Sequence, residues 1–230
     1  MIHEHENHGL LAEQAIQRRP RHRGIVAVDI EDSTRRTDPS KAQLRQSMYD
    51  LFERSLNAGG ITAPRRDPLV DRGDSVLALA HPVDFVPKTT LLDTVVPTLG
   101  ILLTEHNRCH PTQQFRLRMV VHAGEVTFDD RGCFGEALDV AFRLLDASPV
   151  KRILRNTDAP MVLVVSDDVH RSVVRHGYDG IDPKAFSRLL LPRTSNLVRS
   201  AWVRVIGASQ GLPERPGGPV TRMEDYRRRA

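Results

Sequence analysis

Apolar residues along this chain follow two patterns: short continuous runs, and longer stretches in which they recur every three or four positions. Residues 25–28 form a continuous run of β-branched or small side chains, which is typical of a strand buried on both faces. Between an Asp-Pro-Ser start at residue 38 and a glycine pair at 59–60, apolar side chains recur at helical spacing. The pattern therefore predicts a buried strand followed by a long helix.

The rest of the chain continues this alternation of strands and helices. The predicted elements are an extended piece at 61–66, a hairpin at 70–80 that turns at Gly73-Asp74, a helix at 87–107 kinked by Pro97, a strand at 115–123 with a hairpin partner at 124–130, a helix at 135–147, a strand at 161–165, a helix at 167–176, and two strands at 186–191 and 201–206. This order predicts an α+β fold in which helices cover one side of a largely antiparallel sheet.

The composition is that of one globular domain with extra termini. The 230 residues are 40% hydrophobic and 27% charged, which is enough for a substantial core. We predict a leader at residues 1–22, a domain at 23–207 and a disordered, basic tail at 208–230. The sequence contains no run of about 18 apolar residues and no secretion signal, so we expect a cytoplasmic protein without a membrane partner.

Cysteine and charge patterns narrow the class of protein further. Cys109 and Cys133 have no metal-binding spacing and fit a reducing compartment. The net charge of +4 comes from arginines that are spread through the chain, with clusters at 18–23 and 227–229. No recognised nucleic-acid module accompanies them, so we expect no nucleic-acid partner, and a DNA-binding regulator stays an alternative.

Acidic and hydroxyl side chains follow the first predicted strand. Asp29 stands at the exit of the strand, and Asp32, Ser33 and Thr34 follow in a turn whose free N–H groups could hold phosphate oxygens. Asp74, in the predicted hairpin turn, could come beside Asp29, and two carboxylates at a sheet edge can share divalent cations. The alternative is that Asp29 merely caps the next helix.

A second candidate pair lies on the predicted helix at 135–147. Asp139 and Arg143 are four residues apart and therefore share one face of that helix. Taken alone, they could be a surface ion pair of little energetic weight. They follow the strand that ends at Asp29 and the hairpin that holds Asp74 in a fixed order, which favours a common site.

Four motifs in this order, VDIEDST, RGDSVLAL, LRMVVHAGEV and FGEALDVAFRL, resemble the class III nucleotidyl cyclase domain over residues 24–207. The resemblance implies a ferredoxin-like α+β fold and two Mn²⁺ or Mg²⁺ ions in each active site. Asp29 and Asp74 match the metal-binding aspartates, and the backbone carbonyl of Ile30 would also coordinate. Arg143 matches the arginine that stabilises charge during reaction. The domain would work as a head-to-tail homodimer, in which the aspartates of one chain face Arg143 of the other.

Departures from the family bear on the substrate. The turn from Asp32 to Thr34 would wrap the β- and γ-phosphates, although the family has a glycine where this chain has Asp32. Purine cyclases of this class carry base-reading side chains at positions that are Val70 and Gly132 here, and neither side chain can hydrogen-bond a base. The asparagine that orients the ribose is replaced by Asp139, which when ionised can accept a hydrogen bond but cannot donate one.

These departures indicate either lost catalysis or another base, and we favour another base because the metal aspartates and the arginine are all present. The pattern looks most like the pyrimidine cyclases of the bacterial Pycsar anti-phage system. Tyr49 could fill the space of a purine's second ring or simply pack, and Arg193 could contact the triphosphate or be an ordinary surface arginine.

The resemblance thus predicts conversion of UTP, with CTP as the lesser candidate, to the 3′,5′-cyclic nucleotide and pyrophosphate. The product would act on a separate cyclic-nucleotide effector. Two alternatives stay open: an adenylate or guanylate cyclase, and a catalytically silent nucleotide-binding domain.

Overall fold

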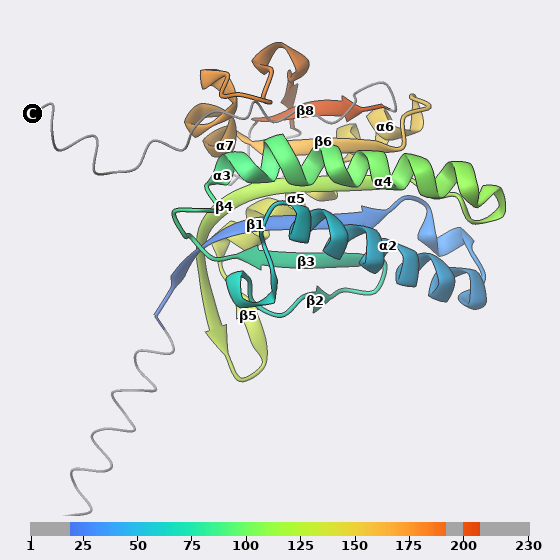
Figure 1. The fold of residues 1–230 in the computed structure, drawn as a ribbon, viewed down its shortest axis with the longest axis horizontal. Helices are drawn as coiled ribbons and strands as arrows, with labels where there is room; N and C mark the ends of the chain where they lie inside the picture. The colour runs from blue at the N-terminus through green and yellow to red at the C-terminus, as the bar shows by residue number, and fades with distance from the viewer. Residues whose placement is uncertain (1–18, 192–199, 208–230) are drawn as a thin grey trace, which may run out of the picture.

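A computed structural model describes residues 19–191 and 200–207 (Figure 1). The strands are β1 (Arg21–Ile30), β2 (Val70–Asp71), β3 (Ser75–Ala80), β4 (Leu117–Asp129), β5 (Gly132–Phe134), β6 (Met161–Ser166), β7 (Ser187–Leu190) and β8 (Ser200–Ile206). They form one sheet in the order β2-β3-β1-β4-β6-β8-β7, with β5 paired to β4. Only the β4–β6 pairing in the described sheet is parallel, so the predicted α+β fold with a largely antiparallel sheet is confirmed.

Helices pack on both faces of this sheet, so the prediction that they cover one side is wrong. The helices are α2 (Asp38–Ala58), α3 (Lys88–Thr90), α4 (Val96–Cys109), α5 (Glu136–Leu145), α6 (Ser148–Arg155) and α7 (Asp167–Ser172). Figure 1 shows α2 and α4 in front of the sheet and α5 behind it. The reason lies in β1, whose continuous apolar run presents an apolar surface on each face, and each surface needs its own cover.

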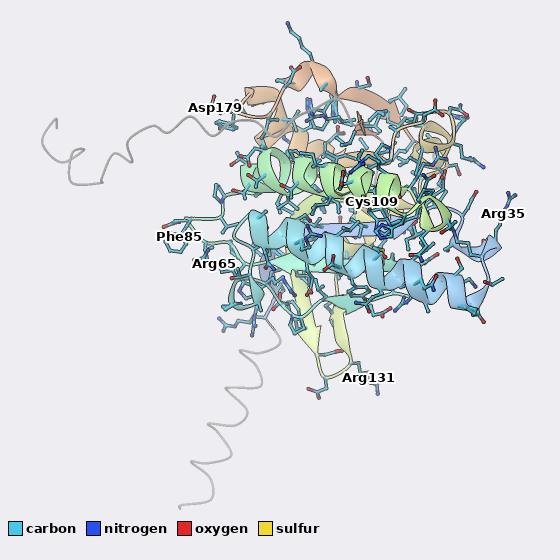
Figure 2. All side chains as sticks on the ribbon, turned by 45° about the vertical axis from the view of Figure 1, so that its right-hand side comes forward. Arg35, Arg65, Phe85, Cys109, Arg131 and Asp179 are labelled. Carbon is cyan, nitrogen blue, oxygen red and sulfur yellow. The ribbon has the colours of Figure 1, made fainter. Side chains whose placement is uncertain are left out.

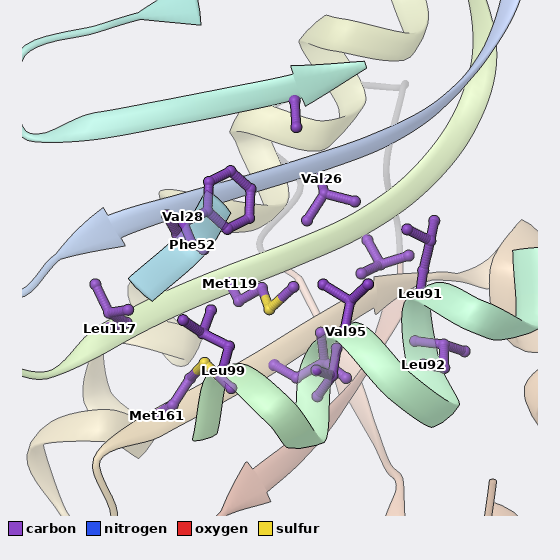
Figure 3. Close-up of a cluster of buried hydrophobic side chains, with 14 of the residues drawn as sticks. Val26, Val28, Phe52, Leu91, Leu92, Val95, Leu99, Leu117, Met119 and Met161 are labelled. Atoms are coloured by element: carbon purple, nitrogen blue, oxygen red, sulfur yellow. The ribbon is translucent and has the colours of Figure 1, made fainter. Parts of the chain in front are cut away.

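Alternate residues of β1 enter two separate hydrophobic clusters. Val26 and Val28 pack with the side chains of α2 and α4, which we call the α2-side cluster. Figure 3 shows both valines beside Phe52 of α2, which is fully buried. Ile25 and Ala27 point the other way and pack with α5 and α6, in the α5-side cluster. The strand is therefore anchored in both layers, and its exit is held in a fixed position.

The predicted long helix is interrupted before Pro97. A π-helical turn (Leu91–Val95) separates α3 from α4, and the backbone N–H of Val96 donates to the carbonyl of Leu91, five residues earlier. Pro97 has no N–H to offer to the preceding turn, and its ring crowds the carbonyl four residues back. The wider π turn makes room for the ring, so the expected kink takes this form.

One predicted hairpin is placed wrongly along the chain. The segment 124–130 was expected to fold back on 115–123, but β4 runs unbroken through both segments and its hairpin partner is β5. Gly124 serves packing here: a Cβ at this position would lie 2.7 Å from the Cβ of Ala137 in α5. The chain turns beyond Asp129, whose Oδ1 accepts hydrogen bonds from two backbone N–H groups, and Figure 2 shows Arg131 at the tip.

Smaller differences concern the ends of elements. The predicted extended piece at 61–66 contains a 3₁₀ turn (Ala63–Arg65), and α6 was not predicted at all. Strand β1 begins at Arg21, so the last two residues of the predicted leader belong to it. Residues 1–18 of the leader, the tail at 208–230 and Arg193 lie outside the described residues. In the described ranges we find no helix with the length and apolarity needed to cross a membrane.

Candidate active site

Asp29 lies near the end of β1 and is almost fully buried. In the sheet register it stands between Ser75 of β3 and Arg118 of β4. The Arg118 Nη2 group donates to Oδ2 of Asp29, which pairs the two buried charges. Burial, with a smaller contribution from the nearby Asp74, raises the pKa of Asp29 to about 6 against the opposing effect of Arg118. The carboxylate therefore sits where additional positive charge would be favourable.

The turn after β1 is joined to the hairpin that carries Asp74. The backbone N–H of Ile30 donates to the Asp74 carbonyl at 3.0 Å, and Ser33 Oγ donates to Asp74 Oδ2 at 2.5 Å. Asp32 has φ of 51°, a left-handed conformation that glycine adopts most easily. This φ gives a physical reason for the family's glycine at that position. The two predicted metal aspartates thus lie together, at the end of β1 and in the loop that leads into β3.

A cavity of about 410 Å³, which we call the α2 cavity, opens beside this turn. It is lined by Ile30, Ser33, Thr34, Arg36, Lys41, Leu44, Arg45, Gly73 and Asp74. Three of these residues are basic, and Lys41 and Arg45 share one face of α2 because they are four residues apart. Arg45 also pairs with Asp71, and Lys41 with the exposed Asp38. The α2 cavity is therefore suited to an anion.

A larger cavity of about 800 Å³, which we call the α5 cavity, lies against α5 and the β4–β5 hairpin. Its lining includes four of the predicted site residues, Val70, Gly132, Asp139 and Arg143. Asp139 and Arg143 are both exposed, and neither forms an ion pair with any described residue. The pair is thus available to a ligand, which a surface ion pair would not be.

The two cavities border different layers of the molecule. The α2 cavity touches Leu44 of the α2-side cluster, and the α5 cavity touches Leu77 and Leu138 of the α5-side cluster. Within one chain, the structure therefore sorts the predicted residues into two groups, one around Asp74 and one around Arg143. It does not bring these groups into one cavity.

Tyr49 belongs to neither group. It packs against the α2-side cluster, and burial together with the nearby Asp71 carboxylate raises the pKa of its hydroxyl group. The guanidinium of Arg45 lies 5.9 Å from the centre of its ring. The structure therefore places Tyr49 outside both cavities, where it fits the packing alternative.

Several residues of the site were not predicted. Arg118 lies within the LRMVVHAGEV motif, but its contact with Asp29 joins residues 89 positions apart in the sequence, which no local pattern reveals. The basic face of α2 is visible in the sequence as the four-residue spacing of Lys41 and Arg45. Its position beside the Ser33 turn depends on how α2 packs.

The donor set around Asp29 and Asp74 fits a hard divalent cation that arrives with a phosphate-bearing ligand. One oxygen of each carboxylate is engaged, by Arg118 and by Ser33, and no described residue donates to either Oδ1 atom. In the described part of the chain no three His, Cys, Asp or Glu side chains are grouped to hold a metal. Mg²⁺ and Mn²⁺ accept one or two carboxylates with water and phosphate oxygens, which suits this site.

Comparisons with known proteins bear on the fold. No protein-family model and no curated protein matches the chain. Solved structures do match: the adenylate/guanylate cyclase/hydrolase from Silicibacter pomeroyi is 20% identical, with a TM-score of 0.55, and the match covers 81% of this chain and 97% of that one.

Two further structures align over a similar length. The guanylate cyclase domain of RhGC from Catenaria anguillulae, in complex with GTP, is 13% identical with a TM-score of 0.51, covering 81% of this chain and 97% of that one. The adenylyl cyclase CyaB from P. aeruginosa is 11% identical with a TM-score of 0.51, covering 84% and 99%. The chain therefore has the fold of class III adenylate and guanylate cyclase domains, as its motifs predicted.

Proposed function

We propose that this chain, with its cyclase fold, is a metal-dependent nucleotidyl cyclase that converts UTP, or less readily CTP, to the 3′,5′-cyclic nucleotide and pyrophosphate. One observation supports the proposal: the predicted metal and phosphate residues lie together around the turn after β1, and Asp139 and Arg143 lie together with Val70 and Gly132 in the α5 cavity. Ser33 ties Asp74 to the turn after Asp29, and Asp139 and Arg143 share the α5 cavity. A silent relative has no need to keep both groups intact.

In this reaction the ribose 3′-oxygen attacks the α-phosphorus in line and pyrophosphate leaves. Asp29, Asp74 and the carbonyl of Ile30 would hold two Mg²⁺ or Mn²⁺ ions, which neutralise triphosphate charge and lower the pKa of the attacking hydroxyl. The turn at Ser33 and Thr34 offers backbone and hydroxyl donors to the phosphates. Around them, the basic side chains of the α2 cavity offset the remaining negative charge.

The two groups would meet on one substrate in a head-to-tail homodimer. Because the α2 and α5 cavities lie against different layers of a single chain, a second chain is needed to present its α5 cavity to the metal aspartates of the first. Arg143 of that second chain would stabilise charge on the transferring phosphate, since a guanidinium stays protonated at neutral pH. Asp139 of the same chain would accept a hydrogen bond from the ribose.

We favour a pyrimidine base because the α5 cavity lacks the base-reading side chains of purine cyclases at two positions. Val70 and Gly132 line it at the positions where purine cyclases carry base-reading side chains, and neither side chain can hydrogen-bond. A pyrimidine cyclase of this kind would make a second messenger for a separate effector, in the manner of the Pycsar anti-phage systems, within the cytoplasm.

A purine cyclase is the second candidate. The solved structures that match are adenylate and guanylate cyclases, and a cavity of about 800 Å³ has room for a two-ring base. A catalytically silent domain would bind nucleotide without releasing pyrophosphate.

One experiment separates these candidates. The purified protein is incubated with Mn²⁺ and each of the four ribonucleoside triphosphates in turn, and cyclic nucleotide and pyrophosphate are quantified by mass spectrometry. We expect cyclic UMP to dominate, and Asp74→Asn to abolish it in a protein that still folds. Cyclic AMP or cyclic GMP as the main product would favour the purine cyclase, and binding without any product would favour the silent domain.

A further inference from the structure

Arg72 lies in the loop between β2 and β3, two residues before Asp74, and lines the α5 cavity. Its guanidinium carbon is 3.9 Å from the centre of the Phe142 ring, which is a close cation–π contact. Phe142 directly precedes Arg143 on α5. The positive charge also reaches Cys133 across the cavity: burial raises the pKa of that thiol, and Arg72 partly opposes the rise. The guanidinium of Arg72, although exposed, is therefore held against the Phe142 ring in the wall of the cavity.

The hydrogen-bonding capacity of this guanidinium is unused. A guanidinium has five N–H donors, and no described residue accepts a hydrogen bond from the side chain of Arg72. Two other arginines near the site are engaged, Arg45 with Asp71 and Arg118 with Asp29, whereas Arg143 of the α5 cavity has no ion pair with a described residue. An arginine that is oriented by an aromatic ring and has all its N–H donors free can donate hydrogen bonds to the oxygen or nitrogen atoms of a ligand.

The surroundings of Arg72 favour a planar ring over a phosphate. Val70, Leu77, Leu138 and Phe142 give the α5 cavity an apolar wall, against which the face of a nucleobase can pack. Acceptor atoms on the edge of such a base would then meet the donors of Arg72. The phosphates have a better partner in the α2 cavity, whose lining has three basic residues and one acidic residue, whereas the α5 cavity is lined by three basic and three acidic residues.

We propose that Arg72 reads the base of the bound nucleotide by donating hydrogen bonds to a ring carbonyl oxygen, and so is a specificity-determining residue. This inference rests on the proposed function and deepens it. Uracil offers two carbonyl oxygens, whereas adenine offers none. Arg72 therefore directs the site toward nucleotides whose base carries a carbonyl group.

The test measures binding without turnover. Dissociation constants are determined in Mn²⁺ for 3′-deoxy-UTP, which lacks the attacking hydroxyl group, and for inorganic triphosphate, which lacks a base. The proteins are the wild type, Arg72→Ala, and Arg54→Ala as a matched control that removes an exposed arginine of α2 away from both cavities. We expect Arg72→Ala to weaken 3′-deoxy-UTP at least about tenfold and triphosphate less than about twofold.

Each other outcome overturns the inference. Equal weakening of both ligands would make Arg72 a phosphate contact or a structural residue, and no weakening of 3′-deoxy-UTP would remove it from the site. Arg72→Lys keeps the charge but loses the planar fork, so it should bind 3′-deoxy-UTP more weakly than the wild type and triphosphate equally well.

Failure of this inference and failure of the proposed function are distinguishable. Wild-type protein that binds 3′-deoxy-UTP through Arg72 but forms no cyclic product would refute the cyclase and leave the base contact standing. Protein that forms cyclic UMP while Arg72→Ala binds 3′-deoxy-UTP normally would refute only the base contact.

Discussion

Replacing Asp29 with asparagine should change how the stability of the protein depends on pH. Asp29 is 8% exposed, and burial raises its carboxyl pKa from 3.8 to about 6 despite the opposing charge of Arg118. The folded protein therefore binds this proton more tightly than the unfolded chain does, so the group favours folding at low pH. Its contribution is complete only well below about pH 4 and is lost as the pH rises through about 6.

The size of the effect follows from the two pKa values. The difference between 6 and 3.8 is 2.2, which at about 1.36 kcal/mol for each unit corresponds to about 3 kcal/mol of unfolding free energy. Asparagine resembles the protonated acid and does not titrate, so the variant lacks this dependence. Arg118 loses its partner in the variant, but it stays charged throughout, so its effect on stability is the same at every pH.

Urea unfolding of both proteins in metal-free buffer from about pH 4 to pH 8 measures this effect. In the difference between the two unfolding free energies, the contributions of groups that titrate alike in both proteins cancel. We expect that difference to move by about 2.4 kcal/mol in favour of Asp29→Asn as the pH rises from about 4 to 7.5, because part of the effect is already lost at pH 4. A difference that stays constant with pH would refute the reasoning that Asp29 is a buried carboxylate with a raised pKa.

Three further substitutions test the turn after β1, the α2 cavity and the packing of α5 on β4. Ser33→Ala removes the hydrogen bond to Asp74, so we expect KM for the metal–nucleotide complex to rise about fivefold in steady-state kinetics, and an unchanged KM would contradict the role of the turn. Lys41→Ala should raise KM by a similar factor without lowering the thermal midpoint, because Lys41 lines the α2 cavity and lies outside the core. Gly124→Val places a Cβ 2.7 Å from that of Ala137, so denaturant unfolding should show a loss of about 1–3 kcal/mol, and a neutral result would contradict the tight α5 contact.

Local patterns predicted most of the fold because they report burial along one element at a time. The apolar run of β1 and the helical spacing in α2 identify both elements. That same run is apolar on both faces, so it also implied a second helical layer, which we did not predict. The prediction of a hairpin at Gly124 was wrong because glycine occurs both at turns and where two elements approach closely. Here the close approach is to Ala137, which is distant in sequence.

The candidate site was also predicted only in part, because motifs located its residues but not their partners. Motifs located Asp29, Asp74, Asp139 and Arg143, because each stands at a recognisable end or face of an element. The partners of these residues come from other strands and helices, as with Arg118 beside Asp29. Such contacts depend on sheet register, which the sequence of one strand does not encode.

The central claim is that two chains share each active site, and mixing two inactive variants tests it most directly. Asp74→Ala removes a residue of the first group and Arg143→Ala a residue of the second, so each variant alone should have below about 1% of wild-type cyclase activity. When subunits exchange, half of the dimers are mixed, and each of these has one intact site. The account therefore predicts recovery of about a quarter of wild-type cyclic nucleotide production in an equal mixture. No recovery, despite demonstrated subunit exchange, would contradict the shared site.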